Sequence, residues 1–376
     1  MNKELLAITR GLIKNDDKAL NLALDSVVKK AVFALDAGVY SVMDKSAVPP
    51  SGDKHDYMSM GPYWWPDPSK GDGLPYIRVD GKKNPESHGN ASDFSRLESM
   101  AAAVETLALA FHFTGMMAYA HHAACLLRTW FLHPNTRMNP HLRYAQVIPG
   151  KTGKRGIGII DTVRFLDVIN AVELLGDSGS WLPSEQVALQ KWFQAYLKWL
   201  MTSPYGRNEA RQHNNHGTWY DAQIAGYALF VGDVATASRV LEACGHKHLM
   251  AQVSPDGRQP YELARNLSFD YSCFNLEGIM ALAQLGERLG IDLWHFQVAG
   301  RDAIRSALDY LVPFADSTKH WPHPQLVAAD QARLLPLFRQ GWRVYQETRY
   351  RDAIQALQHE GRNHDVSQLI CPAAVV

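Results

Sequence analysis

Apolar residues recur at three- and four-residue spacing over most of this chain, and that spacing limits the fold more than any other feature. Side chains three and four residues apart share one face of an α-helix, so each such segment is predicted to be an amphipathic helix. The predicted helices cover residues 18–36, 96–113, 117–132, 161–175, 184–202, 217–231, 235–249, 275–289, 299–313 and 330–358. Asp161 and Ser184 are predicted N-caps, and Gly176 and Gly290 are predicted helix ends. No strict alternation of apolar and polar residues predicts a strand.

Successive helices are joined by short connections, which predicts antiparallel helical hairpins. Such hairpins pack as a bundle, a solenoid or a closed toroid. The sequence has no fixed-period repeat, and this weakens the solenoid interpretation. The chain has 376 residues, enough for one large core or two ordinary domains. No linker separates two halves convincingly, so residues 1–376 are predicted to form a single domain.

Two stretches interrupt the helical pattern, namely residues 46–95 and 133–160. The first is rich in Pro, Gly and Asp and also holds a set of large apolar and aromatic side chains: Tyr57, Tyr63, Trp64, Trp65, Tyr76 and Ile77. Leaving these side chains in water is unfavourable, so residues 46–95 are predicted to form an ordered lid or groove wall. One of the two tryptophans is expected only to pack this loop.

Composition excludes some functions. Lys+Arg and Asp+Glu are both 38, so the basic excess of a nucleic-acid binder is missing. No apolar run approaches the roughly 20 residues that cross a bilayer, so membrane insertion is not expected. The first residues lack a basic stretch followed by an apolar core, which favours a cytoplasmic protein, or a periplasmic one if a signal peptide was removed. Cys125, Cys244, Cys273 and Cys371 fit no zinc or disulfide spacing and are expected to be incidental or buried thiols.

Two polar clusters are candidate sites. The first reads RQHNNHGTWYD from Arg211 to Asp221 and precedes an apolar helical run, so Asn214 or Asn215 can simply cap that helix. A cap explains one asparagine but not Asn-Asn-His together, and spacing alone favours neither interpretation. The second cluster reads YELARNLSFDY up to Tyr271. Its plain interpretation is a surface Arg–Glu pair with a half-buried tyrosine.

Several motifs together resemble the alginate-lyase family of polysaccharide lyases. They are GPYWWPDP, NPES, the IPG…GIGIID stretch, NNHGTWYDAQ, and ELAR followed by a tyrosine, and they span roughly residues 40–290 in the family's order. The chain is especially similar to the branch with glucuronan-type lyases. The resemblance implies an all-α fold, an (α/α) toroid that forms an incomplete barrel of antiparallel hairpins. It also implies a carbon–oxygen lyase that cleaves β-1,4-linked uronate polymers by β-elimination and leaves 4,5-unsaturated uronate ends.

Carried over position by position, the resemblance implies that Asn215 and His216 are the family's Asn-His pair, Arg265 its arginine and Tyr271 its catalytic tyrosine. The Arg-to-Tyr spacing looks one residue shorter than in well-known alginate lyases, which argues against alginate itself as the substrate. The sequence does not decide among mannuronan, alginate, glucuronan and mixed uronate polymers. Asn215 and Arg265 are expected to neutralise the uronate carboxylate. Tyr271 is the candidate base and acid for a D-uronate, once its pKa falls from near 10. His216 is the expected base for the C5 epimer.

Further residues are predicted to bind the sugar chain, because aromatic faces and cations suit a uronate polymer: Tyr63, Trp64, Trp65, Arg143, Gln146, Arg155, Asn214 and Trp219. No HExxH motif occurs, and no pair of histidines has a good ligand spacing, so neither a metal nor a cofactor is predicted. The expected partner is an acidic polysaccharide or oligosaccharide.

Two other functions fit the same helical pattern. A glycoside hydrolase would need two carboxylates, and Asp161, Asp221, Glu262 and Asp270 are available. A non-catalytic glycan-binding helical protein would need neither the Asn-His nor the Arg-Tyr elements.

Overall fold

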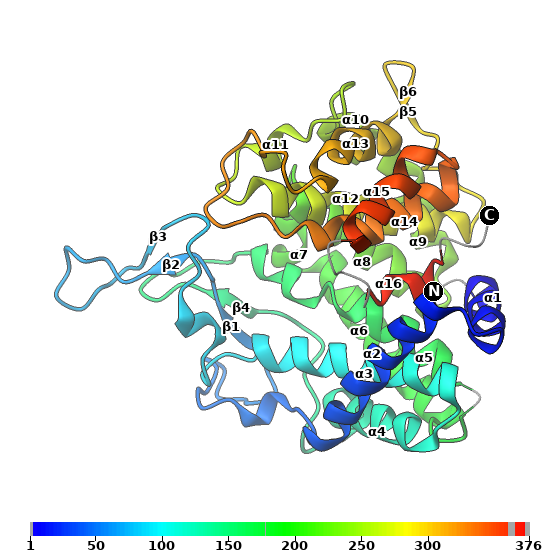
Figure 1. The fold of residues 1–376 in the computed structure, drawn as a ribbon. Helices are drawn as coiled ribbons and strands as arrows, with labels where there is room; N and C mark the ends of the chain where they lie inside the picture. The colour runs from blue at the N-terminus through cyan, green and yellow to red at the C-terminus, as the bar shows by residue number, and fades with distance from the viewer. Residues whose placement is uncertain (1–2, 177, 360–364, 373–376) are drawn as a thin grey trace. The chain divides into compact units, whose positions relative to one another are not determined.

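The computed structural model describes residues 3–176, 178–359 and 365–372 (Figure 1). Helices make up 61% of the chain and the strands are only two to four residues long, so the predicted all-α class is confirmed. The chain divides into two compact units: unit 1 comprises Met1–Lys30, His213–Thr218 and Ser238–Val376, and unit 2 comprises Ala31–Gln212 and Trp219–Ala237. The single domain stays a prediction, and each unit is described by itself.

Unit 2 combines helices with two short pairs of strands. Its elements are η1 (Val42–Asp44), β1 (Met58–Met60), β2 (Trp64–Trp65), β3 (Ile77–Arg78), η2 (Pro85–His88), α3 (Phe94–Thr114), α4 (Met117–Leu127), η3 (Arg128–Leu132), β4 (Tyr144–Val147), η4 (Ile157–Thr162), α5 (Phe165–Leu175), α6 (Pro183–Thr202) and α7 (Pro204–Glu209). Strand β1 pairs in parallel with β4, and β2 pairs antiparallel with β3. The β2–β3 hairpin lies away from α3, α4 and α5 (Figure 1).

Unit 1 is also built mainly of helices. Its elements are α1 (Lys3–Lys14), η5 (Gly245–Leu249), α10 (Met250–Gln252), α11 (Pro260–Leu263), α12 (Ser268–Glu287), β5 (Gln297–Val298), β6 (Arg301–Asp302), α13 (Ala303–Leu311), η6 (Val312–Ala315), η7 (Gln331–Arg333), α14 (Leu334–Tyr345), α15 (Thr348–His359) and α16 (Ser367–Ile370). Helices α2 (Lys18–Asp36), α8 (Asn215–Val231) and α9 (Val234–Cys244) each contribute residues to both units. Among the described residues, no helix is long and apolar enough to cross a membrane.

The helix boundaries correct two predicted N-caps. Helix α6 starts at Pro183, so Ser184 lies inside its first turn, and the Glu185 carboxylate accepts the N–H of Leu182 at 2.9 Å. Proline suits this first position because the first helical N–H groups have no partner within the helix. Asp161 lies in η4, before α5, and has the buried role described below. Gly176 is the C-cap of α5, as predicted.

Large aromatic side chains fill the core of unit 2. Helix α3 packs against α4 and α5, and Phe131, Phe165, Trp192 and Phe193 form a cluster in which ring centroids lie 4.8–6.1 Å apart. Such offset and edge-to-face contacts stabilise a core beyond the burial of area alone. Of the four cysteines, Cys244, Cys273 and Cys371 are buried and Cys125 is partly exposed, and all are free thiols.

A fully buried ion pair anchors the beginning of the loop that contains β1 and β2. The Lys45 ammonium lies 3.0 Å from Asp93 Oδ2, and both side chains are 0% exposed. The ammonium also donates to the carbonyl oxygens of Val42 (2.6 Å) and Lys54 (2.7 Å), so its three N–H donors have three acceptors. Burial lowers the pKa of Lys45 and raises the pKa of Asp93 to about 6, although the partner charge opposes each shift.

Replacing Lys45 is therefore expected to destabilise unit 2. Lys45→Met leaves the Asp93 carboxylate buried without its cation, and breaking such a pair costs about 3–5 kcal/mol. Arg351→Met is the matched control, because it breaks the pair of Arg351 with Asp352, whose side chains are 46% and 61% exposed. The control should lose no more than about 1 kcal/mol of unfolding free energy in urea titrations. Equal losses of unfolding free energy in the two variants would show that the buried pair stabilises the fold no more than the exposed pair does.

Candidate active site

A buried carboxylate holds the first turn of α8. Glu262, in α11, accepts the backbone N–H of Asn215 with Oε1 and the Asn215 Nδ2 group with Oε2, both at 2.7 Å. Burial raises the pKa of Glu262, while the bonds from Asn215 and the nearby charges of Arg265 and His216 oppose that shift. An ionised carboxylate only accepts hydrogen bonds, so the contact fixes the orientation of the Asn215 amide.

The two adjacent asparagines have different positions. Asn214 takes the cap position, since its carbonyl oxygen accepts the N–H groups of Gly217 (2.9 Å) and Thr218 (3.3 Å). Asn215 is the first helical residue and is fully buried, with one amide N–H bound to Glu262. His216 follows on the next position and is half-buried. A simple cap therefore accounts for Asn214 but not for Asn215.

A network of buried amides ties this turn of α8 to α12. Gln252 Oε1 accepts hydrogen bonds from Thr218 Oγ1 (3.1 Å) and Asn275 Nδ2 (3.0 Å). Asn275 Nδ2 also donates to Gln259 Oε1 (2.8 Å), and Gln259 Nε2 donates to the Ser272 carbonyl oxygen (2.9 Å). These side chains are 0–3% exposed. Buried hydrogen bonds of this kind rigidify the segments that they join, although Asn275 Oδ1 and Ser272 Oγ are buried without a hydrogen-bond partner among the described residues. The sequence analysis did not single out Gln252 or Gln259.

Arg265 and Tyr271 are brought into direct contact. The Arg265 Cζ atom lies 3.8 Å from the centroid of the Tyr271 ring, and both side chains are half-buried. Tyr271 lies in the first turn of α12, because the helix predicted from residue 275 begins at Ser268. The interpretation of Arg265 and Glu262 as a surface pair is wrong, since Glu262 is 1% exposed and bound to Asn215. Asn215, His216 and Arg265 thus lie near Glu262, and Tyr271 lies against Arg265.

The carboxylates considered for hydrolysis are bound within the protein. Glu262 binds Asn215, and Asp270 accepts hydrogen bonds from Gln325 Nε2 (2.6 Å) and Arg333 Nη1 (3.4 Å). A hydrolase needs one carboxyl group to protonate the leaving oxygen and a second to activate water or attack the sugar. In unit 1, this arrangement favours the Arg–Tyr pair as the chemical centre.

Asp161 is the centre of a polar cluster in unit 2. Its Oδ2 accepts hydrogen bonds from the hydroxyls of Tyr57 (3.0 Å) and Ser59 (2.6 Å), and its Oδ1 accepts one from Gln146 Nε2 (2.7 Å). Gln146 has a φ of 47° at the point where the β1–β4 register shifts, so a bulge directs its side chain to Asp161. Burial raises the pKa of Asp161 to about 6 although the hydrogen bonds lower it.

Beside Gln146, two cations approach the ring of Trp64. The Arg155 Nη1 group donates to the Gln146 carbonyl oxygen (3.2 Å), and Arg155 Cζ lies 5.6 Å from the Trp64 ring centroid. Lys151 Nζ lies nearer, at 4.1 Å. Burial, with the charge of Arg78, lowers the pKa of Arg155, yet a guanidinium stays protonated at neutral pH. Within the part of the chain that the structure describes, no carboxylate lies within ion-pair distance of Lys151 or Arg155.

The other predicted sugar-binding residues do not join this group. Trp65 Nε1 donates to the Lys82 carbonyl oxygen (2.8 Å), which is the loop-packing role expected of one tryptophan. The carbonyl oxygen of the half-buried Tyr63 accepts the N–H of Val79 at 2.8 Å. Arg143 is exposed before β4, and Trp219 is only 9% exposed. Lys151, which is not among the sugar-binding residues predicted above, is therefore the cation nearest to the Trp64 ring of the two that approach it.

Two glycines explain the GIGIID motif. A Cβ atom on Gly158 would lie 2.5 Å from the carbonyl carbon of Ala145 in β4, and one on Gly156 would lie 2.2 Å from the Tyr205 carbonyl oxygen. Only residues without a Cβ allow η4 to approach β4 and α7 this closely. The motif thus brings Asp161 within reach of Gln146.

Comparison with known proteins identifies the family. The sequence profile of the alginate lyase family matches residues 41–321. The chain is similar to the crystal structure of an alginate lyase from Bacteroides ovatus, with 38% identity, a TM-score of 0.92, and coverage of 98% of this chain and 97% of that one. Alginate lyase A1-III from Sphingomonas species A1 shares the fold, with 16% identity, a TM-score of 0.52, and coverage of 92% and 94%. No curated protein sequence matches significantly.

The fold and this match define a polysaccharide lyase, an enzyme that breaks carbon–oxygen bonds. The chain belongs to the alginate lyase family. The family resemblance drawn from the motifs is confirmed, and the hydrolase and the non-catalytic binding protein are ruled out as the main function.

The raised pKa of Asp161 predicts how stability depends on pH. The Asp161 carboxyl binds its proton more tightly in the folded chain (pKa about 6) than in the unfolded chain (3.8), so its contribution to stability falls as pH rises through about 6. Relative to Asp161→Asn, the wild-type free energy of unfolding should fall by on the order of 1–3 kcal/mol between about pH 4 and pH 7.

Urea unfolding of both proteins across this pH range measures the difference, and the titration of Asp93 cancels because both proteins contain it. A difference that rises with pH would mean that the folded state lowers the pKa of Asp161.

Proposed function

We propose that this lyase cleaves β-1,4-linked D-uronate polymers, glucuronan or mannuronate-containing chains such as alginate, by β-elimination. One observation carries the proposal: the Arg265 guanidinium lies 3.8 Å from the Tyr271 ring, next to the turn in which Glu262 holds Asn215. A permanent cation at this distance stabilises a phenolate, which is the form of tyrosine that removes a proton.

The first task of the site is to neutralise the substrate carboxylate. The C5 proton of a uronate is poorly acidic while the adjacent carboxylate keeps its charge, because the enolate would add a second negative charge. Arg265 and His216 supply donors for this carboxylate, and Asn215 keeps one amide N–H beyond the one bound to Glu262. Donors aimed at developing charge lower a barrier by about 3 kcal/mol each.

Tyr271 then performs both proton transfers. Its phenolate takes the C5 proton, the electron pair forms the C4–C5 double bond, and the C4–O bond breaks. The phenol returns the proton to the departing oxygen. In D-glucuronate and D-mannuronate, H5 and O4 lie on the same side of the ring, so a single group reaches both. Positioned proton transfer of this kind contributes about 10²–10⁴ in rate.

The Trp64 cluster of unit 2 suits a polyanionic sugar. The ring of Trp64 offers an aromatic face, and Lys151 and Arg155 beside it offer positive charge, with no carboxylate within ion-pair distance of either among the described residues. We assign these three residues to a substrate subsite. Trp65, whose indole N–H is bound to the loop backbone, and the buried Trp219 are assigned to packing. The alginate named for the similar structures supports an acidic substrate.

The proposal predicts activity on uronate polymers without added metal. Purified enzyme is incubated with glucuronan, polymannuronate, polyguluronate and hyaluronan, with and without a chelator, while near-ultraviolet absorbance is recorded. Absorbance should rise with glucuronan or polymannuronate, because elimination creates a conjugated unsaturated uronate, and the rise should survive the chelator. A response confined to polyguluronate would contradict the role of Tyr271 and point to His216 as base.

The matching variant is Tyr271→Phe, which removes one oxygen and keeps the ring that contacts Arg265. Turnover should fall at least about 10³-fold, because base and acid are lost together, while the protein stays folded and still binds polymer. Tyr40→Phe makes the same chemical change before η1 in unit 2 and should keep wild-type turnover. Appreciable turnover by Tyr271→Phe would remove this residue from its role.

The Trp64 subsite gives a separate prediction. Lys151→Gln should raise KM for the polymer by about two- to five-fold with little change in kcat, as expected for a partly exposed ionic contact. Lys154→Gln, on the same loop and exposed, is the control and should leave KM unchanged. Steady-state kinetics at low and high salt measure both. Equal rises in KM for the two variants would mean a general effect of charge.

A further inference from the structure

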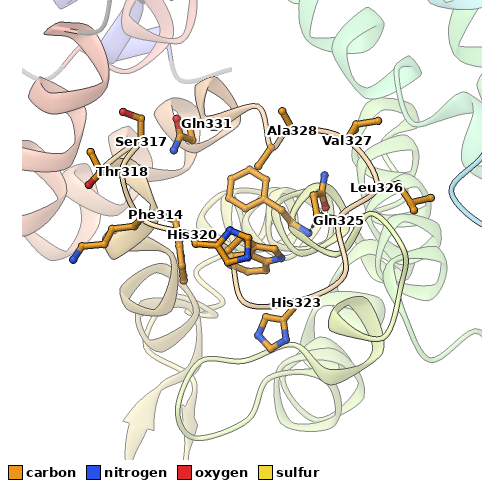
Figure 2. A pocket seen from close by; sticks show the side chains of 14 residues that line it. Phe314, Ser317, Thr318, His320, His323, Gln325, Leu326, Val327, Ala328 and Gln331 are labelled. Carbon is orange, nitrogen blue, oxygen red and sulfur yellow. Dashed lines mark hydrogen bonds between the residues drawn. The ribbon is translucent and has the colours of Figure 1, made fainter.

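Residues 266–270 connect Arg265 to Tyr271, and a distant part of unit 1 holds this connection. We call residues 321–326 the capping segment. They belong to the loop of residues 316–330, between η6 and η7, which lines a cavity of about 550 Å³. Figure 2 shows Gln325 directed toward the ribbon of a neighbouring helix, and Leu326 and Val327 among the residues that line the cavity.

Backbone pairing joins the capping segment to the start of the connection. Leu267 and Gln325 form an antiparallel β-bridge, and the Leu326 N–H donates to the Asn266 carbonyl oxygen at 2.9 Å. This pairing fixes the chain directly after Arg265. Since a β-bridge sets the relative register of two segments, Arg265 and the capping segment keep a defined position.

The capping segment also binds the first residue of α12. The Ser268 N–H and Oγ both donate to the Pro324 carbonyl oxygen, at 3.0 and 2.6 Å, and Trp321 Nε1 donates to Ser268 Oγ at 2.7 Å. Ser268 is fully buried and Trp321 is 6% exposed. The first N–H groups of a helix have no partner within the helix, so these bonds satisfy groups that burial would otherwise leave unpaired.

The Gln325 side chain binds the two residues that directly precede Tyr271 in the chain. Its Oε1 accepts the N–H of Phe269 at 3.0 Å, and its Nε2 donates to Asp270 Oδ2 at 2.6 Å. The two atoms of one amide thus bind two successive residues, and the next residue is Tyr271. An amide meets both needs because it carries an acceptor and a donor. Phe269 also packs edge-on against Trp321, with ring centroids 5.2 Å apart.

The other side of the capping segment is attached to α13. The Tyr310 hydroxyl lies 2.6 Å from His323 Nε2. The capping segment is therefore bonded both to α13 and to the first turn of α12, so a shift of α13 would also move that turn. A displacement of about 1 Å in a reacting group is enough to cost about 10² in rate.

We propose that Gln325 is a positioning residue for the elimination: it caps the first turn of α12, binds Asp270 and thereby sets the direction of Tyr271 against Arg265. The inference rests on the proposed role of Tyr271. Gln325 itself needs no contact with the sugar, so its loss acts on kcat more than on KM.

Gln325→Ala tests this directly. We expect kcat on the preferred uronate polymer to fall between about 10- and 100-fold, with KM within about two-fold of wild type. Thr318→Ala is the matched control in the same loop, because the Thr318 hydroxyl binds only Asp316 among the described residues (2.7 Å). The control should keep wild-type kcat. Circular dichroism and urea unfolding establish that each variant is folded under assay conditions.

A charge swap separates positioning from general stability. Gln325→Glu keeps the acceptor for Phe269 but places a carboxylate against Asp270, so kcat should also fall. The double variant Gln325→Glu/Asp270→Asn again has one carboxylate and one amide, with the two groups exchanged between positions 325 and 270. Arg333 still has Glu277 as its partner, at 3.3 Å. Its kcat should return to within about three-fold of wild type, the coupling expected of residues in contact. The double variant tests the positioning role of Gln325 even if Gln325→Ala does not fold.

The outcomes are distinct from a failure of the proposed function. If Tyr271→Phe is inactive and Gln325→Ala keeps wild-type kcat, the positioning role is overturned and the proposed function stands. Failure of the double variant to recover kcat also overturns it, as does a change in KM alone. Turnover by Tyr271→Phe overturns both.

Discussion

The burial of Glu262 is the constraint on which the candidate active site depends. A carboxylate that is 1% exposed needs donors, and it finds them in the backbone and side chain of Asn215 at 2.7 Å. Losing either partner would leave a buried charge or a buried amide without its hydrogen bonds. The free-energy cost of such an unsatisfied group exceeds the net stabilisation that the bonds provide. The start of α8 is therefore fixed to α11, and with it His216. The amides of Gln252, Gln259 and Asn275 extend the same requirement to α12.

The sequence allowed the local elements to be predicted, because they follow from spacing. The helix expected at 18–36 is α2, Lys18–Asp36, and the helix expected at 184–202 begins one residue earlier, at Pro183. The errors lie where a tertiary contact replaces a local one. Asp161 looks like a cap because an aspartate before an apolar run often is one, yet its carboxylate binds side chains from residues 57 and 59, more than a hundred positions away in sequence.

The same distinction explains what was missed in the candidate site. Motifs indicated Asn215, His216, Arg265 and Tyr271, since family resemblance reports residue identity. Glu262 was interpreted as half of a surface pair. No sequence pattern pointed to Gln325, because its contact with Phe269 joins residues 56 positions apart. Lys151 was not among the predicted sugar-binding residues, whereas Arg143 was, because the sequence does not distinguish single basic residues in irregular segments. Only the fold shows which of them lies against Trp64.

Unit 1 is assembled from pieces that are far apart in the chain: Met1–Lys30, His213–Thr218 and Ser238–Val376. During synthesis its first piece leaves the ribosome early, but the residues against which it packs follow only after most of unit 2 has been made. Domains generally fold as they emerge, so unit 2 has most of its chain first. In the sequence, the six residues 213–218, which include His216 and belong to unit 1, separate the two stretches of unit 2. No single cut in the chain releases either unit whole, and an isolated fragment of either would lack part of its own core.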